Sequence, residues 1–270
     1  LLAGDKIPMM TYASTPEVCY PPGWIYTDKP HYANLISGWG NWLKQTLRVG
    51  SCVMAAFTVW DNPYGRGVLY TIPYLKEIGC EVVGTEFIPS MPLDVTTEVS
   101  RLKKANPDFL IHQYVVGPTA VVIRDCKKVG LEVTHVTTIS YTIGSLVELV
   151  GAELCEGVLY INTYAYHTED IPVYRHFEEL EREYPERFKV EPSPWEGGLS
   201  AASILCEAIE KAVKKVGYES LSGAAVKEAL DNMKDYEHWK ITAPVTYGPQ
   251  RREGSHAIKM GRVKGGKVEI

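Results

Sequence analysis

The chain of 270 residues lacks several patterns that would assign it to a class of protein at once. It has no run of about 18 apolar residues, so the sequence predicts no membrane-spanning helix. Its 6 cysteines include no Cys-x-x-Cys pair, and its 7 histidines have no metal-ligand spacing. We therefore expect no zinc or other metal site and no cofactor. Cys52 and Cys80 begin neighbouring predicted strands, and a disulfide between them stays open beside the reduced state.

Motifs of common catalytic sites are also missing. The sequence has no Gly-x-Ser-x-Gly elbow and no His-Glu-x-x-His pair. Gly65-Arg-Gly67 follows a predicted strand, but no third glycine follows at the spacing of a dinucleotide-binding loop. The acidic residues within 178–183 share one predicted helix, which is typical of a solvated face. We therefore expect a protein that is not an enzyme.

Neither charge is in strong excess. The chain has 28 Lys and Arg residues against 33 Asp and Glu residues, a formal net charge of -5. The basic residues are scattered, which argues against nucleic acid or an anionic membrane surface as a partner.

One pattern is repeated within residues 53–139: a short apolar run, a turn, and an amphipathic stretch. Strands that are apolar on both faces and separated by single helices predict an α/β fold, with a parallel sheet covered by helices on both sides. Small ligands bind such sheets at the carboxyl ends of the strands. The apolar runs cover residues 53–60, 81–88, 109–114 and 133–139.

The rest of the chain is rich in helices and poor in strands. Residues 51–162 supply about five strands, which is enough for one sheet. The remainder has few strands for its amphipathic helices to cover. The chain also begins without Met, so we expect that an opening part of about a hundred residues is absent from this sequence. The other predicted strands are 6–12, 157–162, 243–247 and 256–263, and the other helices are 31–46, 95–105, 144–150, 171–184, 197–216 and 222–233.

Hydroxyl and aromatic side chains follow the predicted strands. Such side chains suit a small polar or aromatic ligand, held by hydrogen bonds and ring contacts. Each also has a plain structural interpretation: the hydroxyls as caps of the next helix, and the tyrosines as packing or core residues. The candidates are Ser14, Thr15, Trp60, Tyr64, Tyr114, Ser140 and Tyr141.

Four segments resemble, in order and spacing, landmarks of the periplasmic solute-binding proteins of branched-chain amino acid ABC transporters. Residues 53–67, VMAAFTVWDNPYGRG, resemble the strand, acidic turn and Tyr-Gly-x-Gly that open the family's second lobe. Residues 93–109 resemble its Asp-Thr helix followed by a Pro-Asp strand entry. Residues 124–131 and 150–158 resemble the next two landmarks. The resemblance runs from about residue 7 to the end of the chain.

The resemblance implies the two-lobed type I periplasmic-binding fold with an incomplete first lobe. Residues 1–50 and 164–242 are then the partial first lobe, and residues 51–163 the second, toward which residues 243–270 return. The implied function is a solute-binding receptor, a monomer that closes its lobes over a ligand and delivers it to an ABC permease. The implied location is periplasmic or extracellular, with a lipid anchor as an open alternative.

The resemblance also assigns roles to individual residues. Ser14 and Thr15, with the backbone at Ala13, match the family's site for the ligand carboxylate. Tyr64 matches a tyrosine that lines the cleft in the second lobe, and Tyr114 lies near another family tyrosine.

Ser140 departs from the family pattern. Amino-acid binders of this family typically have an acidic residue there, which pairs with the ammonium group of the ligand. A neutral serine forfeits that charge-assisted hydrogen bond. We therefore expect a ligand other than a standard α-amino acid: an aromatic or aliphatic carboxylate or an amide. Two other functions stay open, a cytoplasmic sensor of the same fold that responds to an amide and a nucleotide-linked α/β enzyme.

Overall fold

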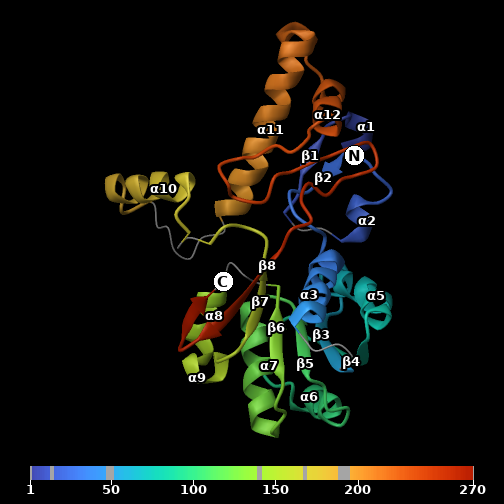
Figure 1. Cartoon of the computed structure of the whole chain (residues 1–270), viewed down its shortest axis with the longest axis vertical. Helices are drawn as coiled ribbons and strands as arrows, with labels where there is room; N and C mark the ends of the chain where they lie inside the picture. Colours follow the sequence, from blue (N-terminus) through green and yellow to red (C-terminus); the bar gives the residue numbers. More distant parts are fainter. Residues whose placement is uncertain are drawn as a thin grey trace. The chain divides into compact units, whose positions relative to one another are not determined.

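The chain divides into two compact units, which we describe separately (Figure 1). The computed structural model describes residues 2–12, 15–46, 52–138, 142–166, 169–187 and 195–269. Unit 1 comprises Leu1–His31 and Thr163–Ala257, and unit 2 comprises Tyr32–Asn162 and Ile258–Ile270.

Unit 2 contains a seven-stranded sheet with the strand order β4-β3-β5-β6-β7-β8-β9. The first five strands in this order pair in parallel, as predicted, whereas β8 and β9 pair antiparallel. The strands are β3 (Val53–Trp60), β4 (Cys80–Ile88), β5 (Phe109–Gln113), β6 (Thr134–Thr137), β7 (Leu159–Asn162), β8 (Lys259–Lys264) and β9 (Lys267–Glu269).

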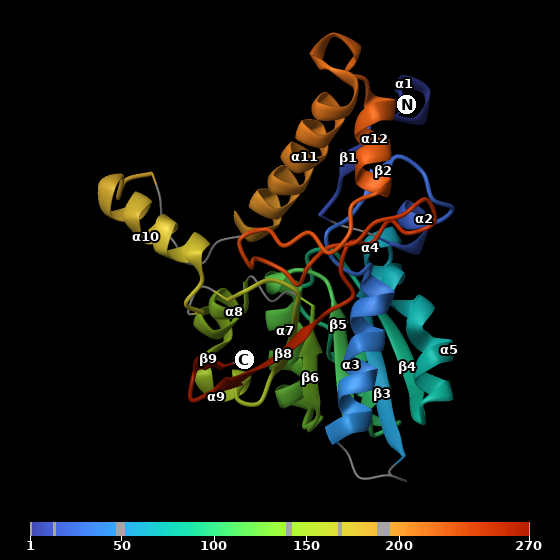
Figure 2. The same ribbon diagram turned by 45° about the horizontal axis from the view of Figure 1, so that its top comes forward.

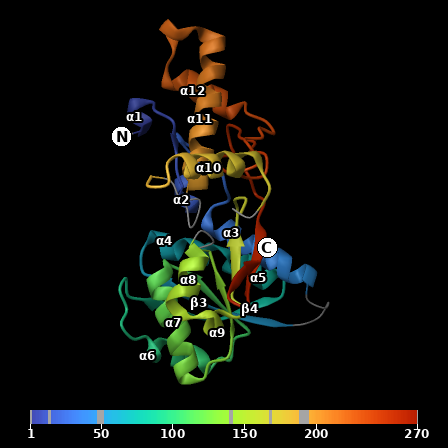
Figure 3. The same cartoon turned by 90° about the vertical axis from the view of Figure 1, so that its left-hand side faces the viewer.

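Helices cover both faces of this sheet (Figures 2 and 3). Phe57 and its alternate neighbours on β3 share one core with α3 and α5, whereas Ala56 shares another with α6 and α7. Successive side chains of β3 therefore point into two different apolar cores, one on each face of the sheet, which explains the continuous apolar sequence of this strand. The helices are α3 (Tyr32–Thr46), α4 (Pro63–Arg66), the 3-10 helix η1 (Gly67–Thr71), α5 (Ile72–Glu77), α6 (Thr96–Lys103), α7 (Val116–Val129), α8 (Ile143–Val150) and α9 (Ala152–Cys155).

Two helix ends in unit 2 follow from single residues. Pro73 lies in the first turn of α5, where its missing N–H costs no helical hydrogen bond, so the α-helix begins only after η1. Gly130 ends α7 in the left-handed conformation at φ 67°, which glycine adopts without steric cost.

The described part of unit 1 is mainly helical, with one parallel pair of short strands. Helices α11 and α12 lie side by side (Figure 2) and pack with Tyr26 and Tyr247 around one apolar core. The elements are α1 (Leu2–Asp5), β1 (Met9–Met10), α2 (Pro16–Cys19), β2 (Ile25–Tyr26), α10 (Pro172–Glu183), α11 (Trp195–Val216), the 3-10 helix η3 (Tyr218–Ser220) and α12 (Gly223–Asp231).

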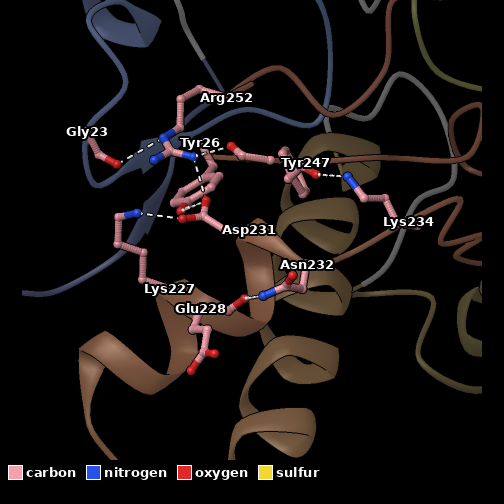
Figure 4. A network of polar contacts seen from close by, with 10 residues as sticks. Gly23, Tyr26, Lys227, Glu228, Asp231, Asn232, Lys234, Tyr247 and Arg252 are labelled. Carbon is pink, nitrogen blue, oxygen red and sulfur yellow. Dashed lines mark hydrogen bonds and ion pairs between the residues drawn. The ribbon is translucent and has the colours of Figure 1, made fainter. Parts of the chain in front are cut away.

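A buried ion pair connects distant segments of unit 1 (Figure 4). The Arg252 guanidinium lies 2.6 Å from the Asp231 carboxylate and donates to the carbonyls of Gly23 (2.9 Å) and Gly248 (2.7 Å). The Tyr26 hydroxyl donates to the same carboxylate at 2.7 Å. The end of α12, strand β2 and the C-terminal loop are therefore held by one set of charge-assisted bonds.

The structure divides the chain differently from the predicted lobes in two segments. Helix α3, expected in the first lobe, packs Leu35 and Trp39 against the unit 2 sheet. Residues 243–257, expected to return toward the second lobe, belong to unit 1 because Val245 and Tyr247 are buried in its core. The strand predicted over 243–247 is wrong: Val245 forms only an isolated bridge with Tyr236.

Two further findings concern the cysteines and the helices. Cys52 and Cys80, whose pairing was left open, are both free thiols. Within the described ranges, no helix combines the length and apolar character needed to cross a membrane.

Candidate functional site

Three of the predicted site residues of unit 2 lie together at the carboxyl edge of its sheet. Trp60 ends β3, Tyr64 lies in α4, and Tyr114 follows β5, which pairs with β3 up to Val59 and Gln113. The ring centroid of Trp60 lies 5.8 Å from that of Tyr64 and 6.4 Å from that of Tyr114. The structure thus forms one aromatic cluster where ligands of parallel sheets bind.

The turn after β3 holds Tyr64 near Trp60. The Asn62 side chain caps α4 by accepting a hydrogen bond of 2.9 Å from the Gly65 backbone N–H. A Cβ at Gly65 would overlap the backbone carbonyl of Trp60, so the helix folds this closely against the strand end only with glycine there. The Asn62 cap and the small Gly65 therefore explain why the chain turns so tightly after β3.

Trp60 and Tyr114 differ in what they offer a ligand. The Trp60 indole N–H is buried and has no acceptor among the described residues, so its donor is unused within them. Tyr114 is fully buried, and its hydroxyl contacts Thr58 and lies 3.0 Å from His112 Nδ1. Tyr114 thus has the core environment that was its alternative interpretation, and its ring lies next to that of Trp60.

A pair of histidines lies in the same sheet. His112 Nε2 lies 2.9 Å from His135 Nδ1, and the two rings stack. Burial lowers the pKa of His112 well below its usual range and that of His135 to about 4. Both side chains are therefore neutral at pH 7, and each is a sheet residue whose ring nitrogen is hydrogen-bonded within the sheet.

In unit 1, Thr15 occupies the position before α2. Its backbone is extended, with φ -104° and ψ 165°, and it is buried. Its side chain makes no capping hydrogen bond, so capping does not explain this hydroxyl. The remaining predicted site residues, Ala13, Ser14, Ser140 and Tyr141, lie outside the described residues.

The structure also gathers polar residues that the sequence-based site omitted. Tyr12 follows β1, and Asp28 and Lys29 follow β2, which pairs with β1 in parallel. The Lys29 ammonium lies 3.5 Å from the centroid of the Tyr12 ring, and the Tyr164 hydroxyl donates to Asp28 at 3.1 Å. Recognising Ile25–Tyr26 as a strand would have identified Asp28 and Lys29 as strand-end residues, but two residues carry too little periodicity.

A hollow of about 660 Å³ lies at the opposite, amino edge of the unit 2 sheet. Its lining includes Cys52, Asn106 and Glu132. Because parallel sheets bind ligands at their carboxyl edge, this hollow does not replace the aromatic cluster as the candidate site.

A family model described as periplasmic binding protein matches residues 1–267. No curated protein matches the chain.

Solved structures of several binding proteins resemble the chain. A branched-chain amino acid ABC transporter protein from Thermus thermophilus, with bound valine, has a TM-score of 0.85 and 23% identity, covering 99% of this chain and 72% of its own. A fatty acid ABC transporter substrate-binding protein from Thermomonospora curvata has a TM-score of 0.81 and 17% identity, covering 100% and 69%. A type 1 periplasmic binding protein from Bordetella pertussis has a TM-score of 0.78 and 23% identity, covering 99% and 75%.

Proposed function

The chain belongs to the periplasmic binding protein family, whose members include ABC transporter substrate-binding proteins, and from this premise we propose that it is the solute-binding receptor of an ABC importer. It binds a small organic solute and releases it unchanged. As the family resemblance implies, its lobes close over the solute, so the solute favours the closed state of the protein over the open one.

The observation that carries this proposal is the aromatic cluster at the carboxyl edge of the unit 2 sheet. Trp60 and Tyr64 supply ring surfaces, and the indole N–H of Trp60, which has no acceptor among the described residues, supplies one donor. Apolar walls with a few converging polar groups are typical of small-molecule sites. In unit 1, Thr15 supplies a buried hydroxyl that caps no helix and therefore suits the carboxylate of the solute.

The solute is an aromatic or aliphatic carboxylate or an amide, rather than a standard α-amino acid. The neutral Ser140 lacks the charge that would pair with an ammonium group. Solved structures with this fold include proteins for an amino acid and for a carboxylate without an amino group: one contains valine, and another is named for fatty acids. The carboxylate is common to both solutes, whereas the ammonium group belongs to valine alone.

The family also suggests where the protein acts and with what. We place it in the periplasm or outside the cell, as a monomer that meets an ABC permease as its partner. The resemblance to the family supports this placement.

Calorimetry on the protein tests the proposal. The panel contains L-valine, L-leucine, benzoate, isovalerate and the amides of the last two. We expect one of the carboxylates or amides to bind, and Trp60→Leu to weaken its binding about 10-fold or more through lost ring contact and hydrogen bonding. Tyr218→Leu is the control, because Tyr218 is an exposed aromatic residue of unit 1.

Three results would count against this proposal. Tight binding of L-valine or L-leucine would reject the preference against amino acids while leaving the receptor function in place. Absence of binding across the whole panel would reject the solute class. Binding that Trp60→Leu leaves unchanged would reject the aromatic cluster as the site.

A further inference from the structure

Lys29 places a buried ammonium group at the carboxyl end of β2. The residue is only 6% exposed, and its Nζ lies 3.5 Å from the ring centroid of Tyr12 and 5.5 Å from that of Tyr164. The two rings stack with an interplanar angle of 12° and centroids 6.1 Å apart. Two aromatic side chains thus line the surroundings of the cation, and both attract it through their faces.

Within the described ranges, this ammonium has no hydrogen-bonded partner. It makes no hydrogen bond or ion pair with any residue that the structure describes. Burial lowers the pKa of Lys29 to about 8, and the neighbouring Asp28 opposes that shift, so the ammonium is mostly protonated at pH 7. A buried cation that no described residue holds by a hydrogen bond or close ion pair is costly.

The adjacent carboxyl group of Asp28 acts on Lys29 through its charge but forms no direct ion pair with it. Asp28 Oδ1 accepts the hydroxyl proton of Tyr164 at 3.1 Å, and Asp28 Oδ2 has no hydrogen-bond partner among the described residues. Burial raises the pKa of Asp28, which favours its uncharged form. The N–H donors of the Lys29 ammonium, which no described residue accepts, therefore remain available to an anion from outside the chain.

The surroundings of Lys29 are built from several segments of unit 1. Tyr12 follows β1 and Lys29 follows β2, so the parallel pairing of the strands brings both to one edge. Gly197, in the first turn of α11, lies so close to the Tyr12 ring that a Cβ there would overlap it. Tyr12 is itself 36% exposed, so the ring that covers the ammonium reaches solvent.

We propose that Lys29, between Tyr12 and Tyr164, binds the anionic group of the solute, and that the solute is a carboxylate with an apolar body. This inference rests on the proposed function above. An ammonium matches the charge of a carboxylate, and a charge-assisted hydrogen bond in a buried site is stronger than a neutral one. The tyrosine rings supply apolar surface for the part of the solute next to its carboxylate.

The test compares carboxylates with their uncharged amides in four proteins. Calorimetry measures the affinities of benzoate and benzamide, and of isovalerate and isovaleramide, for the wild type and for Lys29→Met, Lys29→Arg and Lys211→Met. Lys211→Met is the matched control, because Lys211 also lies over a tyrosine ring in unit 1 but is exposed and pairs with Glu207. Thermal unfolding without solute is recorded for each protein.

The inference predicts a loss that depends on the charge of the solute. Lys29→Met weakens binding of the carboxylate about 10- to 100-fold, the worth of a hydrogen bond to a charged group, and leaves the amide unchanged. Lys29→Arg retains most of the carboxylate affinity, and Lys211→Met retains all of it. Without solute, Lys29→Met unfolds at no lower temperature than the wild type, because an unpaired buried charge has been removed.

Other results separate this inference from the proposed function. If the wild type binds carboxylate and amide equally, or Lys29→Met binds the carboxylate normally, the inference is wrong and the receptor function stands. The same holds if Lys29→Met lowers the unfolding temperature without affecting binding, which is the result for a purely structural lysine. If the wild type binds none of the four compounds and neither L-amino acid, the proposed solute class is rejected, and the inference fails with it.

Discussion

We predict that breaking the Arg252–Asp231 ion pair costs unit 1 several kcal/mol of stability. The Arg252 side chain is 2% exposed and the Asp231 side chain 12%, with 2.6 Å between their charged atoms. Arg252→Met keeps the apolar stem but removes one partner of a buried ion pair, a change that typically costs about 3 to 5 kcal/mol. Asp231 retains Lys227 and Tyr26 as partners, so we expect the lower part of that range.

Two further losses add to the effect of Arg252→Met. The carbonyls of Gly23 and Gly248 lose their donor, and each buried acceptor left unpaired costs about 1 to 3 kcal/mol before relaxation. The guanidinium also lies 4.5 Å from the centroid of the Tyr26 ring. Because these terms share one side chain they do not add independently, and we expect a total of about 3 to 5 kcal/mol.

Urea unfolding and hydrogen exchange together measure this effect. Arg175→Met is the matched control in the same unit: Arg175 donates two hydrogen bonds to Asp170, but both side chains are exposed, so little change is expected. Exchange should quicken in peptides from β2 and α12 and stay unchanged in β3. Equal effects of Arg252→Met and Arg175→Met, or faster exchange throughout unit 2, would refute the reasoning.

Two other predictions concern unit 2. Burial lowers the pKa of His135 to about 4 and holds that of His112 well below its usual range. In the unfolded chain both histidines bind protons below a pKa of about 6.5, whereas in the folded protein they stay neutral to lower pH. The contribution of these histidines to the free energy of unfolding is therefore fully present above about pH 6.5 and is lost as the pH falls toward 4. For His135 alone the loss at pH 5 is about 2 kcal/mol, which urea unfolding can measure. A urea midpoint that does not change with pH would contradict this. Gly65→Ala places a Cβ against the carbonyl of Trp60, so it should weaken solute binding and change the Trp60 fluorescence. The control Gly117→Ala should do neither, because a Cβ there meets open space. Equal behaviour of the two variants would contradict the close turn.

Long strands of unit 2 were predictable because their surroundings are uniform. Residues 53–60 are apolar without interruption, and the structure buries β3 between two layers of helices. Residues 243–247 misled the prediction for a related reason. Val245 and Tyr247 are apolar and alternate as in a strand, but they pack on helices of unit 1 instead of pairing along a sheet. Alternation reports which side is buried and does not identify the partner.

The candidate site was predictable only in part, because burial and partners depend on tertiary structure. Trp60 and Tyr64 follow a strong strand, and the structure brings them together. Tyr114 occupies an equivalent position in sequence, yet its hydroxyl is enclosed by Thr58 and His112. Lys29 follows a strand of two residues, which no periodic pattern reveals.

Hydrogen exchange with and without a bound carboxylate tests the central claim most directly. The experiment uses the benzoate or isovalerate complex, whichever is tighter, under saturating conditions. The account predicts slower exchange at the carboxyl ends of strands in both units, in peptides covering residues 60–66 and residues 25–31. Protection confined to one unit, or centred on residues 106–109 and 132–134 at the amino edge of the unit 2 sheet, would contradict it.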